Sequence, residues 1–398
     1  MNYKHTVYAC FTGYIVQAVV NNFVPLLFLT FQASYGIPLS KITFLITVNF
    51  GVQLLVDLAS AVFVDKIGYR TSVVLAHIFA GAGLLGLTAL PELFPDPYWG
   101  LLLSVVIYAI GGGLIEVLIS PIMESCPTEN KKSAMSLLHS FYCWGHVGVV
   151  LFSTIFFAAF GIQAWKYMTI LWVLIPAVNT ILFSKVPLSH PQEEAVEKTD
   201  IRKLLSKKIF WVMMLLMMSA GASEQAVSQW ASTLAEKGIG VSKAIGDLAG
   251  PMLFATCMGI SRLFYGKYGK NIDLERFMAV SGIVCIGGYL LVGLSGLPVL
   301  GFIGCGICGM AVGIMWPGTF SIAAEAMRGG GTAMFAFLAL AGDVGCSIGP
   351  TVTGIASSMF SDDLKKGILF AVIFPVIFIV ALLRYHASKK SSARVTLS

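Results

Sequence analysis

The chain is 398 residues long, and 57% of its residues are hydrophobic while only 12% are charged. This composition excludes an ordinary soluble globular protein, in which about a quarter of the residues are charged, and it indicates a protein embedded in a lipid bilayer. The formal net charge is +6 at pH 7. Because most of the basic residues lie in loops on one side of the predicted spans, this excess indicates membrane topology, and we do not expect nucleic-acid binding.

Twelve apolar segments follow one another along the chain. Each is close to or above the ~20 residues that a helix needs to cross the hydrocarbon core. We therefore predict an all-α membrane protein with twelve transmembrane helices. The predicted spans are 6–31, 40–64, 71–90, 97–123, 133–160, 164–185, 209–236, 241–266, 275–294, 297–325, 331–358 and 363–386.

One long polar interruption separates six spans from six. It predicts an N-terminal bundle over 1–185, a cytoplasmic linker over 186–208 with a short amphipathic helix at its basic end, and a C-terminal bundle with a short cytoplasmic tail over 209–398. The positive-inside rule places both termini in the cytoplasm. We expect a monomeric, multi-pass protein of the plasma or bacterial inner membrane.

The sequence predicts no metal site, cofactor or enzymatic centre. Most of the eight cysteines lie in apolar segments and are expected to be small buried residues. Cys305 and Cys308 have CxxC spacing, but no second pair or histidine lies near them in the sequence. HExxH, GxSxG and phosphate-cradling motifs do not occur.

A charged turn lies between the second and third predicted spans, where residues 61–70 read AVFVDKIGYR. Asp65 can cap a helix end, Gly68 permits a turn that bulkier residues avoid, and Lys66 with Arg70 gives the loop positive charge. A related stretch, RLFYGKYGK, begins 201 positions later at Arg262. A second half that repeats the first is typical of a duplicated transporter fold.

The turn resembles the loop motif between the second and third helices of the major facilitator superfamily, with Ala61 in place of the first glycine. The resemblance implies two six-helix bundles that alternate access to a central cavity, with the first, fourth, seventh and tenth helices lining it. We expect a gating role for the charged residues and glycine of this turn and for two charged residues of the second half. The gating candidates are Asp65, Lys66, Gly68 and Arg70 in the turn, Arg262 near the cytoplasmic end of the eighth span, and Asp343 within the eleventh span.

Polar residues within the predicted spans recur at helical spacing. Gln17 and Asn21 lie one turn apart, and Asn49, Gln53 and Asp57 follow one another at steps of four. A strongly polar or charged side chain at mid-bilayer costs on the order of 3 kcal/mol, so each requires a partner or a water-filled cavity. The third, sixth, ninth and twelfth spans are poorer in such groups, with His77 and Asn179 as the main exceptions.

Amide and aromatic groups without a basic residue at depth suit a neutral polyhydroxyl ligand, because amides supply paired donors and acceptors and an aromatic ring covers the apolar face of a sugar. The alternative is that polar groups only join helices to each other, and we expect this of about half of them. The substrate-binding candidates are Gln17, Asn21, Asn22, Gln53, Glu116, His139, Tyr142, Gln225, Gln229, Trp230 and Trp316.

A narrower resemblance rests on residues 111–121, which read GGGLIEVLISP. This run is similar to the fourth helix of the fucose permease branch of the superfamily, with Glu116 and Pro121 matching and Ser120 in place of an asparagine. The pair Asn21 and Asn22 matches a pair in the first helix of that branch, and Gln229-Trp230 resembles its seventh helix. The first-helix carboxylate of the branch falls here near Val24 or Pro25, so its role in proton coupling does not transfer.

Isolated carboxylates among neutral polar residues suggest coupling to protons, with sodium as the alternative ion. A carboxyl group in a partly dehydrated cavity can bind and release a proton as the cavity faces each side of the membrane. The coupling candidates are Glu116, then Glu224 and Asp57. Asp57 has an alternative role as a latch between the second and eleventh helices.

These features predict a secondary active transporter of a small neutral polar solute, most simply a proton-coupled sugar transporter. One alternative is a proton-coupled exporter of drugs or amphipathic metabolites, with the methionines of 213–218 forming part of its pocket. The fifth span lacks the Gly-Pro motif of the superfamily's drug antiporters, which argues against this alternative. A non-transporting receptor on the same fold is a second alternative.

Overall fold

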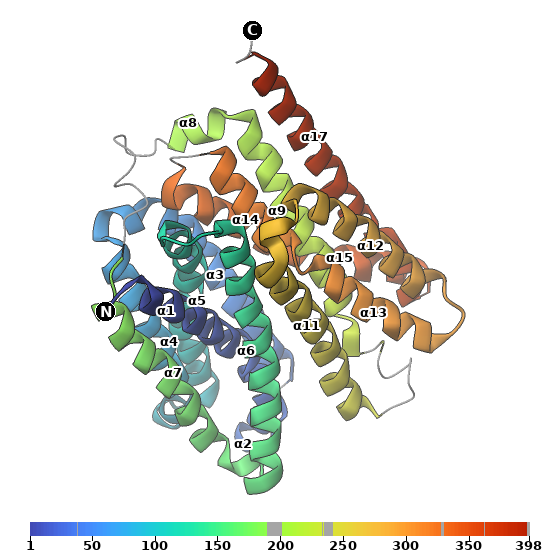
Figure 1. Cartoon of the computed structure of the whole chain (residues 1–398). Helices are drawn as coiled ribbons and strands as arrows, with labels where there is room; N and C mark the ends of the chain where they lie inside the picture. The colour runs from blue at the N-terminus through green and yellow to red at the C-terminus, as the bar shows by residue number, and fades with distance from the viewer. Residues whose placement is uncertain are drawn as a thin grey trace. The chain divides into compact units, whose positions relative to one another are not determined.

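The computed structural model describes residues 1–37, 39–188, 201–232, 234, 242–327, 330–361 and 363–395. Over these residues it consists of helices and their connections (Figure 1). Twelve of the helical segments in the described part of the chain are long and apolar enough to cross a membrane. The all-α membrane fold class with twelve spans is therefore confirmed.

The chain forms two compact units. The N-terminal unit comprises residues 1–128, 141–197 and 331–336, and the C-terminal unit comprises 129–140, 198–330 and 337–398. Two long helices are divided between the units: the first turns of α6 (Lys131–Phe160) belong to the C-terminal unit, and the first turns of α15 (Gly331–Met359) belong to the N-terminal unit. The linker predicted over 186–208 lies partly outside the described residues, so the predicted domain division stays a prediction.

The helices of the N-terminal unit follow the predicted spans closely. The first span is interrupted by Pro25 in a short 3-10 turn, where proline cannot donate a backbone hydrogen bond. Asp96 caps the fourth span by accepting a 3.0 Å hydrogen bond from the Tyr98 backbone N–H. The elements are α1 (Tyr3–Asn22), η1 (Val24–Leu27), α2 (Phe28–Tyr35), α3 (Leu39–Ile67), α4 (Tyr69–Leu93), α5 (Pro97–Ser125), most of α6, η2 (Ile162–Ala164) and α7 (Trp165–Lys185).

Glycines bring the backbones of α4 and α5 into direct contact. A Cβ atom on Gly111 would lie 2.5 Å from the Ala76 carbonyl oxygen, and one on Gly83 would lie 2.3 Å from the Tyr108 nitrogen. Side chains at these two positions would force the helices apart. Small residues thus serve close helix contact here, as is usual in membrane proteins.

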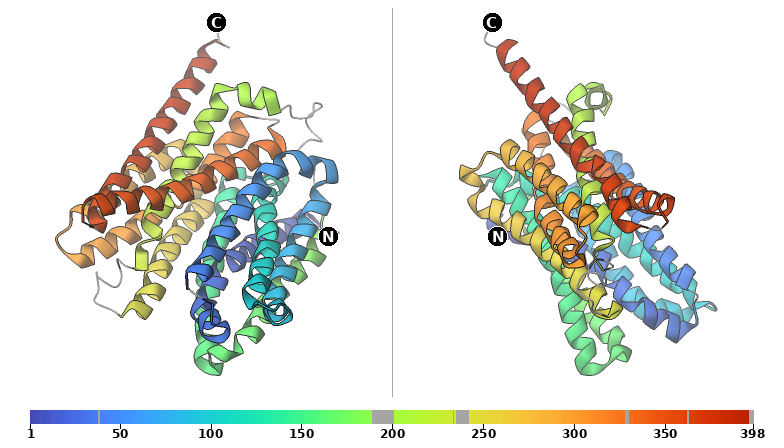
Figure 2. Two further views of the ribbon diagram at one scale, coloured as in Figure 1. Left: turned by 180° about the vertical axis from the view of Figure 1, so that it is seen from behind. Right: turned by 90° about the vertical axis from the view of Figure 1, so that its right-hand side faces the viewer.

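The C-terminal unit holds the other six spans. Within it, α9 packs against α17, and α13 packs against both α11 and α12 (Figures 1 and 2). The tenth span is divided into α13 and α14, and the twelfth into α16 and α17. The elements are α8 (Ile201–Ser206), α9 (Lys208–Ser228), α11 (Lys243–Tyr268), η3 (Gly269–Asn271), α12 (Leu274–Leu294), α13 (Pro298–Val312), α14 (Met315–Ala326), most of α15, α16 (Leu364–Ala371) and α17 (Ile373–Val395).

The internal repeat is visible at the helix ends but not in the turns that follow. Ile67 ends α3 and Tyr268 ends α11, and these residues are 201 positions apart. Gly68 then takes a positive φ of 87° with ψ of 151°, whereas Gly269 has φ of −62° and continues into a 3-10 turn. Only the first of the two related turns therefore demands glycine for its backbone conformation.

Candidate functional site

Five polar side chains of the N-terminal unit form one hydrogen-bonded cluster, which we call the amide network. They are Gln17 and Asn21 on α1, Asn49 and Gln53 on α3, and Glu116 on α5. The Gln17 Nε2 donates to Gln53 Oε1 at 3.2 Å and to Glu116 Oε2 at 3.0 Å. The Gln53 Nε2 and Asn49 Nδ2 both donate to Asn21 Oδ1, at 2.9 and 3.2 Å. Three helices are thus joined through amide groups.

The amide network contains two buried acceptors that are not satisfied. The side chains of Gln17, Asn49 and Gln53 are buried. Among the described residues, Gln17 Oε1 and Asn49 Oδ1 have no hydrogen-bond partner. Leaving such an acceptor without a donor costs about 1–3 kcal/mol. A hydroxyl or water bound beside these oxygens would therefore recover free energy that the network alone does not provide.

Glycines on α5 make the amide network possible. A Cβ atom on Gly112 would lie 3.3 Å from Gln53 Cδ and 3.4 Å from Gln17 Oε1. On Gly113 it would lie 3.1 Å from the Gln53 Cα. The glycine run before Glu116 therefore lets α5 approach α1 and α3 closely enough for its carboxylate to reach Gln17.

A small cavity adjoins the amide network where α1 is interrupted. Its volume is about 20 Å³, and its polar lining consists of Asn21, Asn49 and Tyr108. The remaining lining is apolar and includes Phe28 and Phe50. A volume of this size holds about one water molecule or one methyl group.

Other candidates on the same helices differ in what they contact. Asp57 is fully buried one turn beyond Gln53. Asn22 turns back to its own helix, because its Nδ2 donates to the Ala18 carbonyl oxygen at 2.9 Å. The structure thus unites Gln17, Asn21, Gln53 and Glu116 but not Asn22.

The C-terminal unit contains a buried ion pair that sequence reasoning missed. The Arg262 Nη2 lies 3.4 Å from Glu224 Oε2, and their side chains are 4% and 13% exposed. Arg262 also donates from Nε to the Gly313 carbonyl oxygen at 2.9 Å and from Nη1 to the His139 carbonyl oxygen at 3.1 Å. The sequence does place an arginine several residues inside the end of an apolar span. The corresponding position in the first half of the internal repeat is Ala61, so the repeat does not predict a buried charge here.

The candidate polar and aromatic residues on α9, directly after it and on α14 do not form a comparable network among the described residues. Gln225 accepts a 3.1 Å hydrogen bond from its neighbour Ser228, while Gln229 is exposed. The buried Trp230 Nε1 has no partner within the described part of the chain. Trp316 lies against Gly342, where a Cβ atom would be 2.1 Å from the indole ring.

Two further candidates lie on helices that are divided between the units. Tyr142 is half-buried on α6 and belongs to the N-terminal unit. Asp343 is half-buried on α15 in the C-terminal unit, and its backbone carbonyl oxygen accepts a 3.1 Å hydrogen bond from Ser347.

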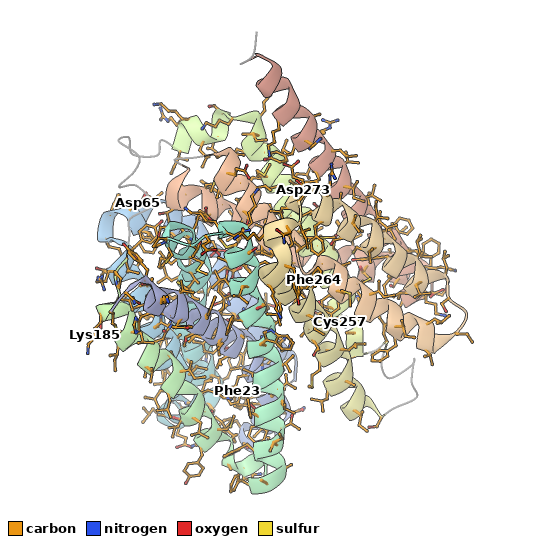
Figure 3. All side chains as sticks on the ribbon, in the orientation of Figure 1. Phe23, Asp65, Lys185, Cys257, Phe264 and Asp273 are labelled. Atoms are coloured by element: carbon orange, nitrogen blue, oxygen red, sulfur yellow. The ribbon has the colours of Figure 1, made fainter. Side chains whose placement is uncertain are left out.

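In the charged turn after α3, the acidic residue Asp65 and the basic residue Lys66 have different surroundings. Asp65, labelled in Figure 3, accepts a 2.7 Å hydrogen bond from Thr332 Oγ1 within the N-terminal unit. Tyr69 also hydrogen-bonds Thr332. Lys66 is exposed. The turn therefore contacts the first turn of α15, and the proposed gating role of these residues stays a prediction.

Arg70 has a structural role at the end of α7. Its guanidinium donates three hydrogen bonds of 2.8–2.9 Å to backbone carbonyl oxygens there. The last carbonyls of a helix lack partners within the helix, and a cation compensates the negative end of its dipole. The acceptors are Phe183, Ser184 and Val186.

His77 in the third span and Asn179 in the sixth span, the two polar exceptions named above, pair with each other. Asn179 Nδ2 on α7 and His77 Nε2 on α4 lie 2.8 Å apart, and the same Asn179 nitrogen donates to the Ala9 carbonyl oxygen of α1 at 3.0 Å. His77 Nδ1 lies 2.7 Å from the Val73 carbonyl oxygen. These contacts join α1, α4 and α7, which supports a structural role for both residues.

The fold agrees with the match of the chain to a known protein family. The family model described as Major Facilitator Superfamily matches residues 9–350. The chain belongs to the major facilitator superfamily. It is thus a transporter of that superfamily and an integral multi-pass membrane protein.

Individual members of the major facilitator superfamily resemble the chain over nearly its whole length. An "Uncharacterized MFS-type transporter Ent638_1421" of Enterobacter sp. (strain 638) is 22% identical, over 92% of this chain and 90% of its own. A variant of the E. coli fucose:proton symporter FucP has a TM-score of 0.81 at 14% identity, covering 97% of this chain and 99% of that one. The proton:xylose symporter XylE has a TM-score of 0.79 at 14% identity, covering 96% and 94%. These likenesses establish the shared fold.

Proposed function

We propose that this superfamily member transports a small neutral polyhydroxyl solute, most simply a sugar, by alternating access. The observation that carries the proposal is the amide network with its two unsatisfied buried acceptors, Gln17 Oε1 and Asn49 Oδ1. Sugar hydroxyls are donors as well as acceptors, so they can satisfy amide oxygens that no group of the described residues satisfies. Hydrogen bonds between the amide side chains also hold these two oxygens in place before a ligand binds, which lowers the cost of ordering them on binding.

The charges of the two units favour a neutral ligand over an anionic one. Apart from Glu116, every side chain of the amide network is an uncharged amide. In the C-terminal unit, the Arg262 guanidinium donates to three protein acceptors, one of them the Glu224 carboxylate. An anionic substrate would have to displace this carboxylate to reach the buried positive charge.

Glu116 is the first candidate for proton coupling. Its carboxylate accepts from Gln17, which also bonds Gln53, so the protonation state of Glu116 acts directly on a group of the substrate-binding network. Glu224 is the second candidate and is held by Arg262. Asp57, one turn from Gln53, is the third. The structurally similar FucP and XylE are both described as proton symporters, which supports a proton over sodium.

The proposal includes a location and an orientation. A monomer in the plasma or bacterial inner membrane with both termini in the cytoplasm agrees with the distribution of basic residues in the loops. The same orientation places Lys66 and Lys267, which lie near the ends of α3 and α11, on the cytoplasmic side.

Counterflow in proteoliposomes tests the function directly. Vesicles loaded with one unlabelled compound from a panel of monosaccharides, polyols and carboxylates are diluted into the same labelled compound. We expect transient accumulation of at least one monosaccharide or polyol and of no carboxylate, with protein-free vesicles as the control. Exchange of carboxylates alone would contradict the neutral-solute proposal, and stabilisation by a sugar without exchange would indicate a receptor.

A second candidate function is export of amphipathic compounds. The small cavity beside the amide network has an apolar lining that suits such compounds, but at about 20 Å³ it would have to widen to hold one. Most of its lining is apolar, including Phe28 and Phe50. A resistance assay with cationic and neutral amphipathic drugs separates the two functions, because only the exporter raises the tolerated drug concentration. Phe50→Ala would lower that tolerance in an exporter and leave sugar counterflow largely intact in a sugar transporter.

A further inference from the structure

The short helix α8 and the start of α9 carry a cluster of exposed cations beside exposed apolar side chains. Arg202, Lys203, Lys207 and Lys208 are all exposed. Between 201 and 223 the sequence contains no acidic residue. Lys207 and Lys208 form no ion pair with any residue in the described part of the chain. We call these four cations the α8 basic cluster.

The position of the α8 basic cluster along the chain places it at a membrane boundary. The seventh span begins at Lys208, and α8 ends two residues earlier at Ser206. A helix joined so closely to a span lies at the level where hydrocarbon gives way to headgroups. Phosphate groups of lipids occupy this level.

A side-chain hydrogen bond joins α8 to the start of α9. The Trp211 Nε1 donates a 2.9 Å hydrogen bond to the Leu205 carbonyl oxygen, and Leu204 is buried. Trp211 and Leu205 nevertheless keep 56% and 36% of their surface exposed. Exposed tryptophan and leucine beside lysine and arginine are the composition of a surface that lies in the membrane interface.

From this arrangement we infer that the α8 basic cluster, with Trp211 and Leu205, is a binding site for the headgroups of anionic phospholipids. The cations would contact lipid phosphates while the indole and leucine side chains enter the acyl boundary. Long basic side chains reach headgroups readily because their apolar stems lie along hydrocarbon. The charge of the cluster favours anionic over zwitterionic lipids, and salt weakens this preference.

Lipid binding to the full-length protein in detergent tests the site. Native mass spectrometry compares bound phosphatidylglycerol and phosphatidylcholine of the same acyl chains. The site variant carries Arg202→Gln, Lys203→Gln, Lys207→Gln and Lys208→Gln. The matched control removes four exposed cations near the ends of other spans: Lys4→Gln, Lys185→Gln, Lys267→Gln and Lys270→Gln.

We expect the site variant to bind phosphatidylglycerol at least about tenfold more weakly than the wild type, and the control variant to stay within about twofold. Phosphatidylcholine binding should be equal in all three proteins. An equal loss in the site and control variants would overturn the site. Competition by millimolar inorganic phosphate would also overturn it, because the cluster would then bind a free anion and not a lipid.

A second variant keeps the test decisive if the site variant does not fold. Far-UV circular dichroism and thermal unfolding in neutral detergent verify that the site variant retains its helices. If it does not, Lys207→Gln with Lys208→Gln changes only the two residues outside α8. We expect this double variant to lose at least about threefold in phosphatidylglycerol affinity, and an unchanged affinity would overturn the inference.

Discussion

The Gln17 Nε2 donates a 3.0 Å hydrogen bond to Glu116 Oε2, which joins the first helix to the one carboxylate of the amide network. An ionised carboxylate accepts hydrogen bonds only, whereas a protonated one also donates. Protonation therefore changes what Glu116 offers to Gln17, and through Gln17 it affects Gln53. The proposed coupling rests on this relationship.

Replacing Glu116 by glutamine should separate binding from coupling. Glu116→Gln keeps the size of the side chain and an acceptor for Gln17 but cannot exchange a proton. We expect counterflow within a few-fold of the wild type and loss of uptake driven by a pH gradient, both measured in proteoliposomes. Glu92→Gln, at an exposed acid, is the control. Full pH-driven uptake by Glu116→Gln would remove Glu116 from the coupling role.

Two variants on the same helix distinguish the amide network from a neighbouring amide. Gln17→Leu removes both donated hydrogen bonds, so substrate affinity should fall on the order of tenfold. Asn22→Ala should change the affinity less than about twofold, because among the described residues Asn22 bonds only its own helix. Substrate-dependent thermal stabilisation measures both, and equal losses would show that the network has no special role.

Removal of Arg262 should destabilise the C-terminal unit. Arg262→Met leaves the Glu224 carboxylate buried without its cation, and breaking one side of a buried pair costs on the order of 3–5 kcal/mol. Adding Glu224→Gln removes the charge that was left behind and should restore most of the loss. Thermal unfolding in detergent compares the single and double variants. A single variant as stable as the wild type would show that the pair contributes little.

Replacing two glycines that have no close neighbours by alanine measures the effect of backbone conformation without steric clashes. A Cβ atom would meet no described atom within 4 Å at either Gly68 or Gly51. Gly68 has φ of 87° and ψ of 151°, a region that residues other than glycine rarely adopt, so Gly68→Ala should destabilise by about 1–3 kcal/mol. Gly51 lies inside α3, where alanine is favoured by up to about 1 kcal/mol. Thermal unfolding should therefore shift in opposite directions, and shifts of the same sign would contradict this reading of the turn.

Hydropathy was sufficient to predict the fold, because each span must satisfy its own backbone in lipid and so must be a long apolar helix. The spacing of Gln17 and Asn21, and of Asn49 and Gln53, likewise placed these residues on shared faces. The structure unites these four residues with Glu116 in the amide network.

Side-chain direction is what the sequence could not give. Asn21 and Asn22 are adjacent and chemically identical, yet only Asn21 reaches another helix because successive residues point about 100° apart. Arg262 was assigned to a helix end, since sequence position does not reveal that its long side chain extends toward Glu224. The pairing of His77 with Asn179 depends on which spans become neighbours, and spacing within one span carries no such information.

The division of α6 between the two units has a consequence for how the chain is made. Residues 129–140 leave the ribosome well before residues 198–330, with which they share a unit. Ser136 and His139 contact Arg262 through hydrogen bonds that span more than 120 positions of sequence. The beginning of α6 can therefore form its native contacts only after the second half has been synthesised. In an N-terminal half produced alone, this segment would lack those contacts.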